Sequence, residues 1–335
     1  MIFRKNVPLA DFNTFGINST AGEMYIVENK SELFSGEIQN ALSKPFFVLG
    51  GGSNILLSKD FIPSIIKYNG KGIQFISEDS ESRTLQVNAG ETWDDVVLFA
   101  VDNNLAGIEN LSLIPGTAGA APIQNIGAYG QEVGNAIITV TYYDIPGKCE
   151  VTLSNEDCKF GYRDSIFKSQ LKGKAIITSI TLRLKKTFIP DLRYKQLSEI
   201  FLNSNEAPSL KTMRDTIISI RESKLPNPAL LGNAGSFFKN PIVSEKQLKF
   251  LKSKFETVPS FSSSGLIKIP AAWLIENAGL KAKRIGNVGT YEKQPLVLVN
   301  YGGASGEEIL KFSELIKSEV SKKLGVSIEC EVNIV

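Results

Sequence analysis

The sequence has 335 residues, with 37 Lys and Arg, 35 Asp and Glu, no His, three Cys, 28 Gly and 14 Pro. A chain of this length exceeds what one hydrophobic core usually serves, so we expect two or three domains, and a net charge of +2 gives no reason to expect nucleic acid or an anionic membrane as a partner. The absence of His excludes Ser-His-Asp hydrolysis and His-ligated metals, and the Cys lack the CxxC spacing of a zinc site.

Short apolar runs separated by turn residues dominate the N-terminal half. We expect strands at residues 45–49, 55–57, 65–68, 73–76, 85–87, 136–143, 150–153 and 175–184. A helix is expected from residue 93, because Thr92 and Asp95 have capping-box spacing and apolar residues recur with the helical period after them. Residues 187–208 show no strong periodicity and are interpreted as a linker with a local turn.

The C-terminal part has the pattern of a second α/β unit. A helix at 210–223 is stopped by Pro226 and Pro228, and a short helix runs from Pro270 to Gly279. A strand at 296–300 precedes a final helix that opens at Ser305 and closes at Gly325, with Glu308 at the capping-box position. Residues 326–334 alternate between apolar and polar, as a last strand does.

No run approaches the roughly 20 apolar residues that a membrane helix needs. Residues 1–16 contain no apolar leader, so we expect a cytoplasmic protein.

A GGGSN stretch, Gly50 to Asn54, stands between two strand-like runs. Consecutive glycines let main-chain N–H groups converge on an anion, although a tight turn between strands explains them equally well. The stretch is neither a Rossmann fingerprint nor a P-loop, since a β-like run follows it and no Gly-Lys-Ser/Thr is present. Phosphate binding and a plain turn both stay open.

Residues 115–130 contain four glycines and no charged side chain, which is unusual for a surface loop. They favour lining a flat, partly apolar ligand, with Gln124 and Asn125 available to hydrogen-bond it; the alternative is a long exposed loop.

Three further segments carry side chains suited to chemistry. Arg163 fits a carboxylate or a developing oxyanion, or an ordinary ion pair with Asp164. Ser236 cannot be activated as a nucleophile without His, which leaves proton donation, hydrogen bonding or a turn role. Glu329 and Glu331 share the polar face of the last strand, as functional acids or as a solvated face. Taken singly, these signals indicate only a two-part protein that binds a phosphate-containing ligand.

Taken in order, six motifs resemble the UDP-N-acetylenolpyruvoylglucosamine reductase family in its longer subtype. They are FNTFGI (12–17), LGGGSNILL (49–57), IPGTAGAAPIQNIGAYGQE (114–132), FGYRDSIFK (160–168), LGNAGSFFKNP (231–241) and IECEV (328–332). The resemblance implies an α+β fold, with a vanillyl-alcohol-oxidase/PCMH-like FAD-binding region of two subdomains and a smaller C-terminal α/β substrate domain. The expected limits are 1–68 and 69–208 for the FAD-binding subdomains and 209–325 for the substrate domain, with the strand at 326–335 free to return to the first subdomain.

The resemblance also assigns residues by position. The catalytic set is Arg163, Ser236 as proton donor, and Glu331. The cofactor-binding set is Leu49, Gly50, Gly51, Gly52, Ser53, Asn54, Pro115, Gly116, Thr117, Gln124, Asn125, Gly127, Ala128 and Arg221. The substrate-binding set is Tyr162, Tyr194, Lys224, Asn240 and Gln294. No metal is implied, and the chain departs from the family at Asn333, where an arginine is common.

The implied activity is reduction of the enolpyruvyl ether of UDP-N-acetylglucosamine to UDP-N-acetylmuramate, in peptidoglycan precursor synthesis and hence cell-wall growth and division. NADPH is the implied co-substrate and non-covalent FAD the cofactor, which explains why no His is needed. We expect a monomer with a small-molecule substrate. Two alternatives are an FAD-dependent oxidase using O₂ on the same scaffold and a non-catalytic nucleotide-binding module.

Overall fold

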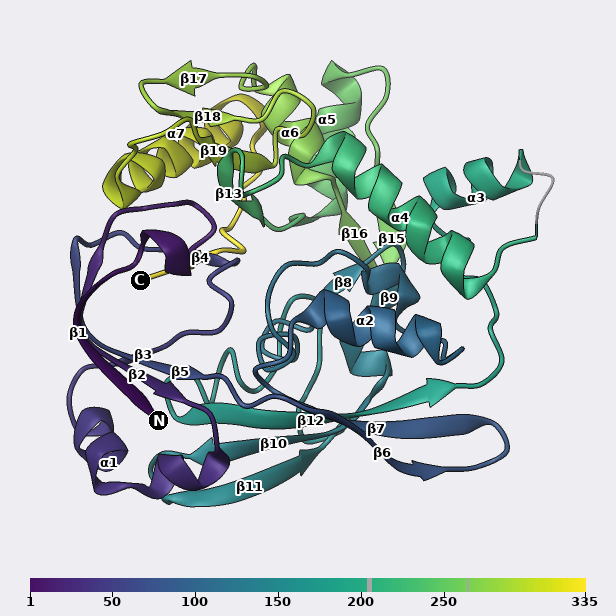
Figure 1. Ribbon diagram of the computed structural model, residues 1–335. Coiled ribbons are helices and arrows are strands. Elements are labelled where there is room, and N and C mark those ends of the chain that lie inside the picture. The colour runs from purple at the N-terminus through teal and green to yellow at the C-terminus, as the bar shows by residue number, and fades with distance from the viewer. Residues whose placement is uncertain (204–206, 264) are drawn as a thin grey trace. The chain divides into compact units, whose positions relative to one another are not determined.

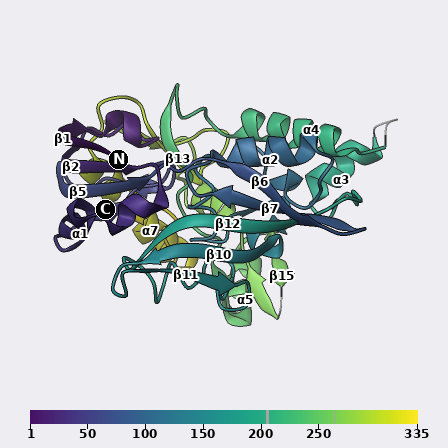
Figure 2. The ribbon, with the colours of Figure 1, turned by 60° about the horizontal axis from the view of Figure 1, so that its bottom comes forward.

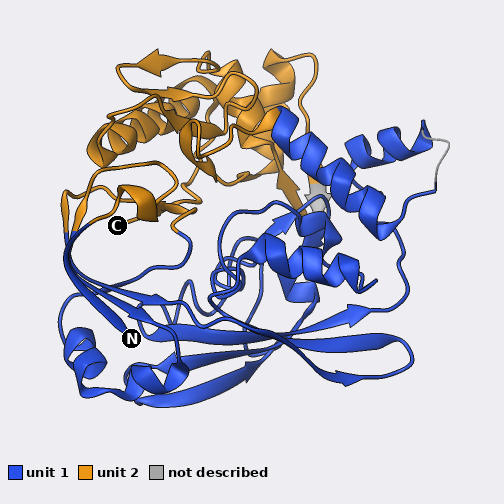
Figure 3. Cartoon of the chain, in the orientation of Figure 1, with its two compact units in different colours: residues 1–7, 21–51, 62–223 blue, residues 8–20, 52–61, 224–335 orange. Residues whose placement is uncertain are grey.

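The computed structural model describes residues 1–203, 207–263 and 265–335, and these fall into two compact units (Figure 3). Unit 1 comprises residues 1–7, 21–51 and 62–223, and unit 2 comprises residues 8–20, 52–61 and 224–335. The domain limits expected at residues 68 and 208 differ from the limits of these units. Residues 8–20 and 52–61 lie in unit 2, and residues 210–223 lie in unit 1.

The smaller sheet of unit 1 has the strand order β1-β2-β5-β3. Its strands are β1 (Ile2–Pro8), β2 (Thr20–Val27), β5 (Phe61–Tyr68) and β3 (Phe47–Val48). The short 3-10 helix η2 (Lys30–Phe34) and helix α1 (Gly36–Leu42) follow β2. β3 runs parallel to β5, with Phe47 opposite Ile65, and this pairing carries the chain directly into the glycine-rich stretch.

The larger sheet of unit 1 is antiparallel, in the order β11-β10-β12-β7-β6 (Figure 2). Its strands are β6 (Ile73–Glu78), β7 (Ser82–Asn88), β10 (Ile137–Asp144), β11 (Cys149–Ser154) and β12 (Ala175–Lys185). Each was expected from its apolar run. Helix α2 (Trp93–Asp102) buries the apolar face that its period predicted, in one core with β7, β10 and β12.

The start of α2 differs from the expected capping box, because no side-chain hydrogen bond caps the helix at Thr92. Thr92 instead forms an isolated bridge with Thr117, and the acid that contacts other elements is Asp94 rather than Asp95. A tertiary contact has taken the place of the local cap.

Residues 187–208 are not the linker that we expected. Helix α3 (Lys195–Leu202) forms within them and packs on α4 (Leu210–Lys224) through a small core of Leu197, Met213, Ile217 and Ile220 (Figure 1). The apolar spacing of so short a helix is hard to recognise without its partner; residues 204–206 of the predicted linker lie outside the described residues.

Unit 2 is built on a sheet with the order β13-β19-β18-β17. Its strands are β13 (Gly232–Ser236), β17 (Arg284–Ile285), β18 (Val288–Thr290) and β19 (Val297–Asn300), with helices α6 (Ala271–Asn277) and α7 (Gly306–Leu324). The capping box of α7 is confirmed, since the Ser305 side chain accepts from the Glu308 N–H and Glu308 reaches back to Ser305. Gly325 ends the helix at φ +65°, the left-handed conformation that favours glycine.

A second sheet of unit 2 has the order β14-β16-β15, and helix α5 lies beside it in the sequence. These elements are β14 (Ile242–Val243), α5 (Glu245–Lys254), β15 (Phe261–Ser263) and β16 (Leu266–Lys268). The sequence analysis did not single out α5, although Ser244 and Gln247 form a capping box at its start.

The chain ends in β20 (Asn333–Ile334), which pairs in parallel with β4 (Ile55–Leu56). The expected strand over 326–334 is therefore much shorter. Val326, Ile328 and Val332 are buried as the alternation predicted, but Ile334 is exposed because the strand has reached its end. Within the described residues, no helix has the length and hydrophobicity needed to cross a lipid bilayer.

Candidate active site

The loop after β3 brings two glycine main chains against each other inside unit 1. A Cβ added to Gly51 would lie 2.9 Å from the Cα of Gly116, and one added to Gly50 would lie 3.2 Å from Thr117 Oγ1. The Gly116 carbonyl accepts from the N–H of Trp93 at 3.0 Å, which fixes the second loop on α2. Only glycine fits at residue 51, and the two loops present main-chain groups rather than side chains.

The next glycine serves a different purpose, because Gly52 belongs to unit 2. Its φ is +68°, its carbonyl accepts from Thr14 N–H at 3.1 Å, and an added Cβ would lie 2.0 Å from the carbonyl oxygen of Phe12. Gly52 therefore packs two segments of unit 2 together. The GGGSN stretch therefore has two structural roles: Gly50 and Gly51 meet the second loop in unit 1, and Gly52 packs on Phe12 in unit 2.

Asn125 connects the charge-poor loop to the segment that carries Arg163. The side-chain amide donates to Glu132 Oε2 at 2.9 Å and to the Gly161 carbonyl at 3.0 Å, while Oδ1 accepts from Gly134 N–H at 2.9 Å. The residue is buried with φ +46°. These bonds occupy its amide within the protein, so any contact with a ligand falls to its main chain.

Arg163 is held in an unusual backbone conformation. Its φ is +53°, in a turn closed by hydrogen bonds between Gly161 and Asp164, and such a conformation costs a non-glycine residue about 1 kcal/mol or more. Arg163 Nη2 donates to the Gly127 carbonyl at 2.5 Å, in β8 (Gly127–Ala128), which pairs with β9 (Gln131–Glu132). A Cβ at Gly127 would lie 2.8 Å from Arg163 Nη1 and 2.9 Å from the Gln131 carbonyl oxygen, and the main-chain contact restricts this position to glycine.

Two arginines on one face of α4 point into unit 1. Arg214 forms a two-pronged ion pair with Asp94 of α2, with both N–O distances at 2.7 Å, and Asp94 also accepts from Leu113 N–H at 2.5 Å. Burial raises the pKa of Asp94, but the hydrogen bonds and charge of Arg214 and the Leu113 N–H outweigh it and leave that pKa lowered. Leu113, at φ +58°, leads into Pro115 of the candidate cofactor loop.

Arg221, two turns further along α4, is the more unusual of the two. Its Nε is buried and has no hydrogen-bond partner among the described residues. Burial lowers the pKa of its guanidinium, opposed by the charges of Tyr129 and Asp94. A buried guanidinium with an unused donor is the chemistry expected of an anion- or carbonyl-binding group.

Tyr194, at the start of α3, contacts Tyr129 of the charge-poor loop at 115–130. Its ring lies 5.1 Å from that of Tyr129, edge to face, and its side chain is largely exposed. Tyr162, expected to bind substrate, lies beside the Arg163 guanidinium at 5.5 Å.

In unit 2, the residues that follow Ser236 pair with the segment that carries Glu331. Glu331 N–H donates to the carbonyl of Phe237 at 2.8 Å, and Cys330 forms an isolated antiparallel β-bridge with Phe238. Asn54 Nδ2 donates to the Glu331 carbonyl at 3.4 Å. Main-chain contacts thus join two segments almost a hundred residues apart in the sequence, one carrying the expected proton donor and the other the expected acid.

The remaining expected residues have structural partners of their own. Asn240 Oδ1 accepts from Ala271 N–H at 2.9 Å at the start of α6, and the Gln294 carbonyl accepts from Val297 N–H at 2.9 Å. Asn333, where the resemblance led us to expect an arginine, donates to the Asn54 carbonyl through its main chain at 3.1 Å and its side chain at 3.2 Å. The departure at residue 333 therefore joins β20 to the GGGSN stretch.

Comparison with known proteins agrees with these features. A family model described as an FAD binding domain matches residues 37–151, and one described as UDP-N-acetylenolpyruvoylglucosamine reductase, C-terminal domain, matches residues 227–335. Proteins named UDP-N-acetylenolpyruvoylglucosamine reductase from Flavobacterium johnsoniae and Amoebophilus asiaticus are 42% and 43% identical to the chain, with all of each chain covered. The chain belongs to the UDP-N-acetylenolpyruvoylglucosamine reductase family.

The fold agrees as well. A crystal structure of UDP-N-acetylenolpyruvylglucosamine reductase from Thermus caldophilus superposes with a TM-score of 0.68 and 24% identity, covering 99% of both chains. The expected α+β fold, with an FAD-binding region and a C-terminal domain, is confirmed. So is the identification as a flavin-dependent oxidoreductase.

The chain's own residues fit FAD on two observations. Loops at Gly51 and Gly116 meet main chain to main chain, and the buried Nε donor of Arg221 has no hydrogen-bond partner within the described part of the chain. Across residues 1–203, 207–263 and 265–335, no group of three His, Cys, Asp or Glu side chains is arranged to hold a metal ion. Asp94, Arg214 and Glu132 were not predicted from the sequence, because contacts between elements set their positions.

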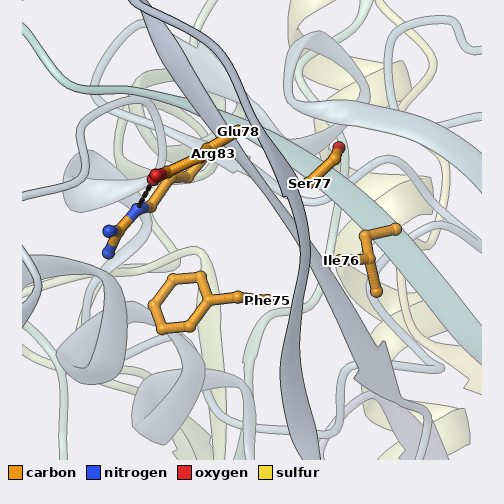
Figure 4. Close-up of a pocket in the computed structure, with 5 residues that line it drawn as sticks. All are labelled: Phe75, Ile76, Ser77, Glu78 and Arg83. Carbon is orange, nitrogen blue, oxygen red and sulfur yellow. Dashed lines mark hydrogen bonds and ion pairs between the residues drawn. The ribbon is translucent and has the colours of Figure 1, made fainter.

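A surface hollow lies on the β6–β7 hairpin of unit 1. Phe75, Ile76, Ser77, Glu78 and Arg83 line it (Figure 4). Arg83 pairs with Glu78 and lies 4.8 Å from the Phe75 ring, so its charge is already satisfied. No residue expected to bind the cofactor or substrate lines this hollow.

Proposed function

We propose that this protein uses NADPH to reduce the enolpyruvyl ether of UDP-N-acetylglucosamine to UDP-N-acetylmuramate, within cytoplasmic peptidoglycan precursor synthesis. The proposal is carried by full-length identity above 40% to proteins named as this reductase. The adjacent segments of Ser236 and Glu331 support it, because a reductase of a carbon–carbon double bond needs a proton donor and an acid near one carbon.

FAD, when bound, would supply the chemistry for hydride transfer from the nicotinamide to the terminal carbon of the alkene. That transfer leaves carbanion character on the carbon next to the carboxylate. We assign three side chains to this charge and its neutralisation, all of them as proposals.

Arg163 supplies a fixed positive charge to the substrate carboxylate. Its strained backbone and its bond to Gly127 hold the guanidinium in one orientation before substrate arrives. The carbanion character next to the carboxylate makes the intermediate enolate-like. Glu331, either as a protonated acid or through a water molecule, stabilises that developing enolate. Tyr162 lies against the Arg163 guanidinium and is assigned to the substrate with it.

Ser236 delivers the proton to the carbon next to the carboxylate. A serine hydroxyl is a very weak acid, so the step requires a strongly basic intermediate and the exclusion of water. Buried Phe237 and Phe238 follow Ser236 directly and give this stretch a dry setting. Tyr194, Lys224, Asn240 and Gln294 are assigned to the nucleotide and sugar of the substrate.

The test is a product assay on purified full-length protein, run anaerobically with NADPH and the enolpyruvyl sugar nucleotide. We expect a yellow protein that is bleached by NADPH, and a product heavier than the substrate by two hydrogens. Rapid reoxidation by O₂ without the sugar nucleotide would indicate an oxidase, and colourless protein that binds UDP would indicate a non-catalytic module. Sedimentation of the same preparation tests the expected monomer.

A further inference from the structure

Lys67 contacts the glycine loop, although no motif in the sequence drew attention to it. It lies on β5, next to the point where Leu49 N–H donates to the Ile66 carbonyl at 2.9 Å. Its ammonium Nζ donates to the Gly50 carbonyl at 2.6 Å. The lysine is half-buried, and all of these residues belong to unit 1.

The charge of Lys67 has no anionic partner among the residues that the structure describes. An ammonium has three donors, and the Gly50 carbonyl is the one acceptor that the described residues provide. Burial lowers the pKa of Lys67, and the nearby charge of Lys71 lowers it further. Lys71, by contrast, lies 3.6 Å from Glu91. A half-buried cation without an anion destabilises the folded protein. The position of Lys67 therefore indicates that a ligand brings the missing negative charge.

The contact with Gly50 also orients the main chain. No peptide bond in the described residues is cis, and in a trans peptide the C=O and the following N–H point to opposite sides. Binding of Lys67 to the Gly50 carbonyl therefore turns the Gly51 N–H away from the lysine. Among the described residues, neither the Gly50 nor the Gly51 N–H donates to a protein acceptor. Unused N–H groups on consecutive glycines are typical of phosphate-binding loops.

We propose that Lys67 supports the FAD diphosphate site: it holds the Gly50–Gly51 peptide so that the Gly51 N–H faces the diphosphate, and its positive charge attracts the diphosphate from the other side of that peptide. This inference rests on FAD binding by the chain. The diphosphate is the anionic part of FAD, and it is the part that main-chain N–H groups and a lysine recognise. Lys67 is thus a binding and positioning residue; it takes no part in the transfer of hydride or proton.

The experiment measures the FAD dissociation constant of full-length apoprotein by quenching of flavin fluorescence. Three variants separate the roles: Lys67→Met removes the donor and the charge, Lys67→Gln keeps a donor without the charge, and Lys67→Arg keeps the charge. Lys71→Met is the matched control. It removes the same charge four residues further along the chain, and Lys71 already has a carboxylate partner in Glu91.

We expect Lys67→Met and Lys67→Gln to bind FAD at least about tenfold more weakly than wild type, which corresponds to about 1.4 kcal/mol. Lys67→Arg and Lys71→Met should stay close to wild type. Raising the salt from about 50 to 500 mM should weaken binding more steeply in wild type than in Lys67→Met, because screening acts on the diphosphate contact. The apoprotein of Lys67→Met should melt no lower than wild type, since a costly buried charge is gone.

Unchanged FAD affinity and salt dependence in Lys67→Met would overturn the inference. A Lys67→Gln variant that binds as wild type would also overturn it, because the lysine would then be only an anchor for the Gly50 carbonyl. Failure of the wild-type protein itself to bind FAD would instead overturn the proposed function, and this inference with it.

Discussion

Individual glycines in the GGGSN stretch are required for different reasons. Gly51 faces Gly116 across the two loops of unit 1, whereas Gly52 packs on Phe12 in unit 2. At residue 51 the backbone φ is one that any residue adopts, so the requirement comes from space alone. A substitution there should disturb the cofactor loops with little effect on the core.

Gly51→Val should fold but purify without yellow colour. A Cβ at residue 51 would meet the Gly116 Cα at 2.9 Å, closer than real Cβ contacts, so the loop at 115–117 must move. Gly36→Val is the control, because nothing lies within 4 Å of a Cβ at the start of α1. The measurements are flavin content per protein and circular dichroism; full flavin occupancy in Gly51→Val would contradict the account.

Residue identities were readable from the sequence more easily than residue partners. Asn125 was recognised as a polar residue in a charge-poor loop, but its bonds to Glu132, Gly134 and Gly161 depend on a fold that closes over it. The unused donor of Arg221 is likewise a property of burial. Such features have no local sequence signal, because residues distant in the sequence create them.

The ion pair between Asp94 of α2 and Arg214 of α4 supports the candidate cofactor loop. Asp94 joins Arg214 to the Leu113 N–H, and Arg214 is only 7% exposed. One carboxylate thus holds in place a helix and the strained Leu113, two residues before Pro115.

Asp94→Asn should lower the free energy of unfolding by about 2 kcal/mol, the order expected for hydrogen bonds between charged groups that are largely buried. Asp95→Asn, the exposed neighbour in the same helical turn, is the matched control. The measurement is urea denaturation of both variants and wild type at neutral pH. Equal loss in both variants would show that Asp94 has no special role.

The same pair has a predictable dependence on pH. The folded pKa of Asp94 lies below its ordinary value of 3.8, so its contribution to stability is fully present above that pH. It is lost as pH falls through the lower folded pKa, because the protonated acid no longer pairs with Arg214. The difference in stability between wild type and Asp94→Asn should therefore close below about pH 4.

Elements with a strong internal period were predictable, and those that depend on a neighbour were not. The α7 capping box and the α2 apolar face are written in consecutive turns. Helix α3 was missed because one buried residue, Leu197, anchors it on α4. The last strand was overestimated, since alternation continues where pairing with β4 has not yet begun.

At the scale of the whole molecule, the proposed chemistry divides between the two units. The FAD-binding family model covers residues 37–151, which lie mostly in unit 1 with Arg163 and Arg221. Ser236 and Glu331 belong to unit 2. Flavin reduction by NADPH should therefore be insensitive to Ser236, whereas flavin reoxidation by the sugar nucleotide should require it.

Stopped-flow spectroscopy of Ser236→Ala tests this division most directly, by mixing the protein first with NADPH and then with the enolpyruvyl sugar nucleotide. We predict flavin bleaching at the wild-type rate, followed by reoxidation slowed by about 10²–10⁴-fold, the usual contribution of a positioned general acid. Equal slowing of both steps, or a wild-type rate in the second, would contradict the role of Ser236 as proton donor.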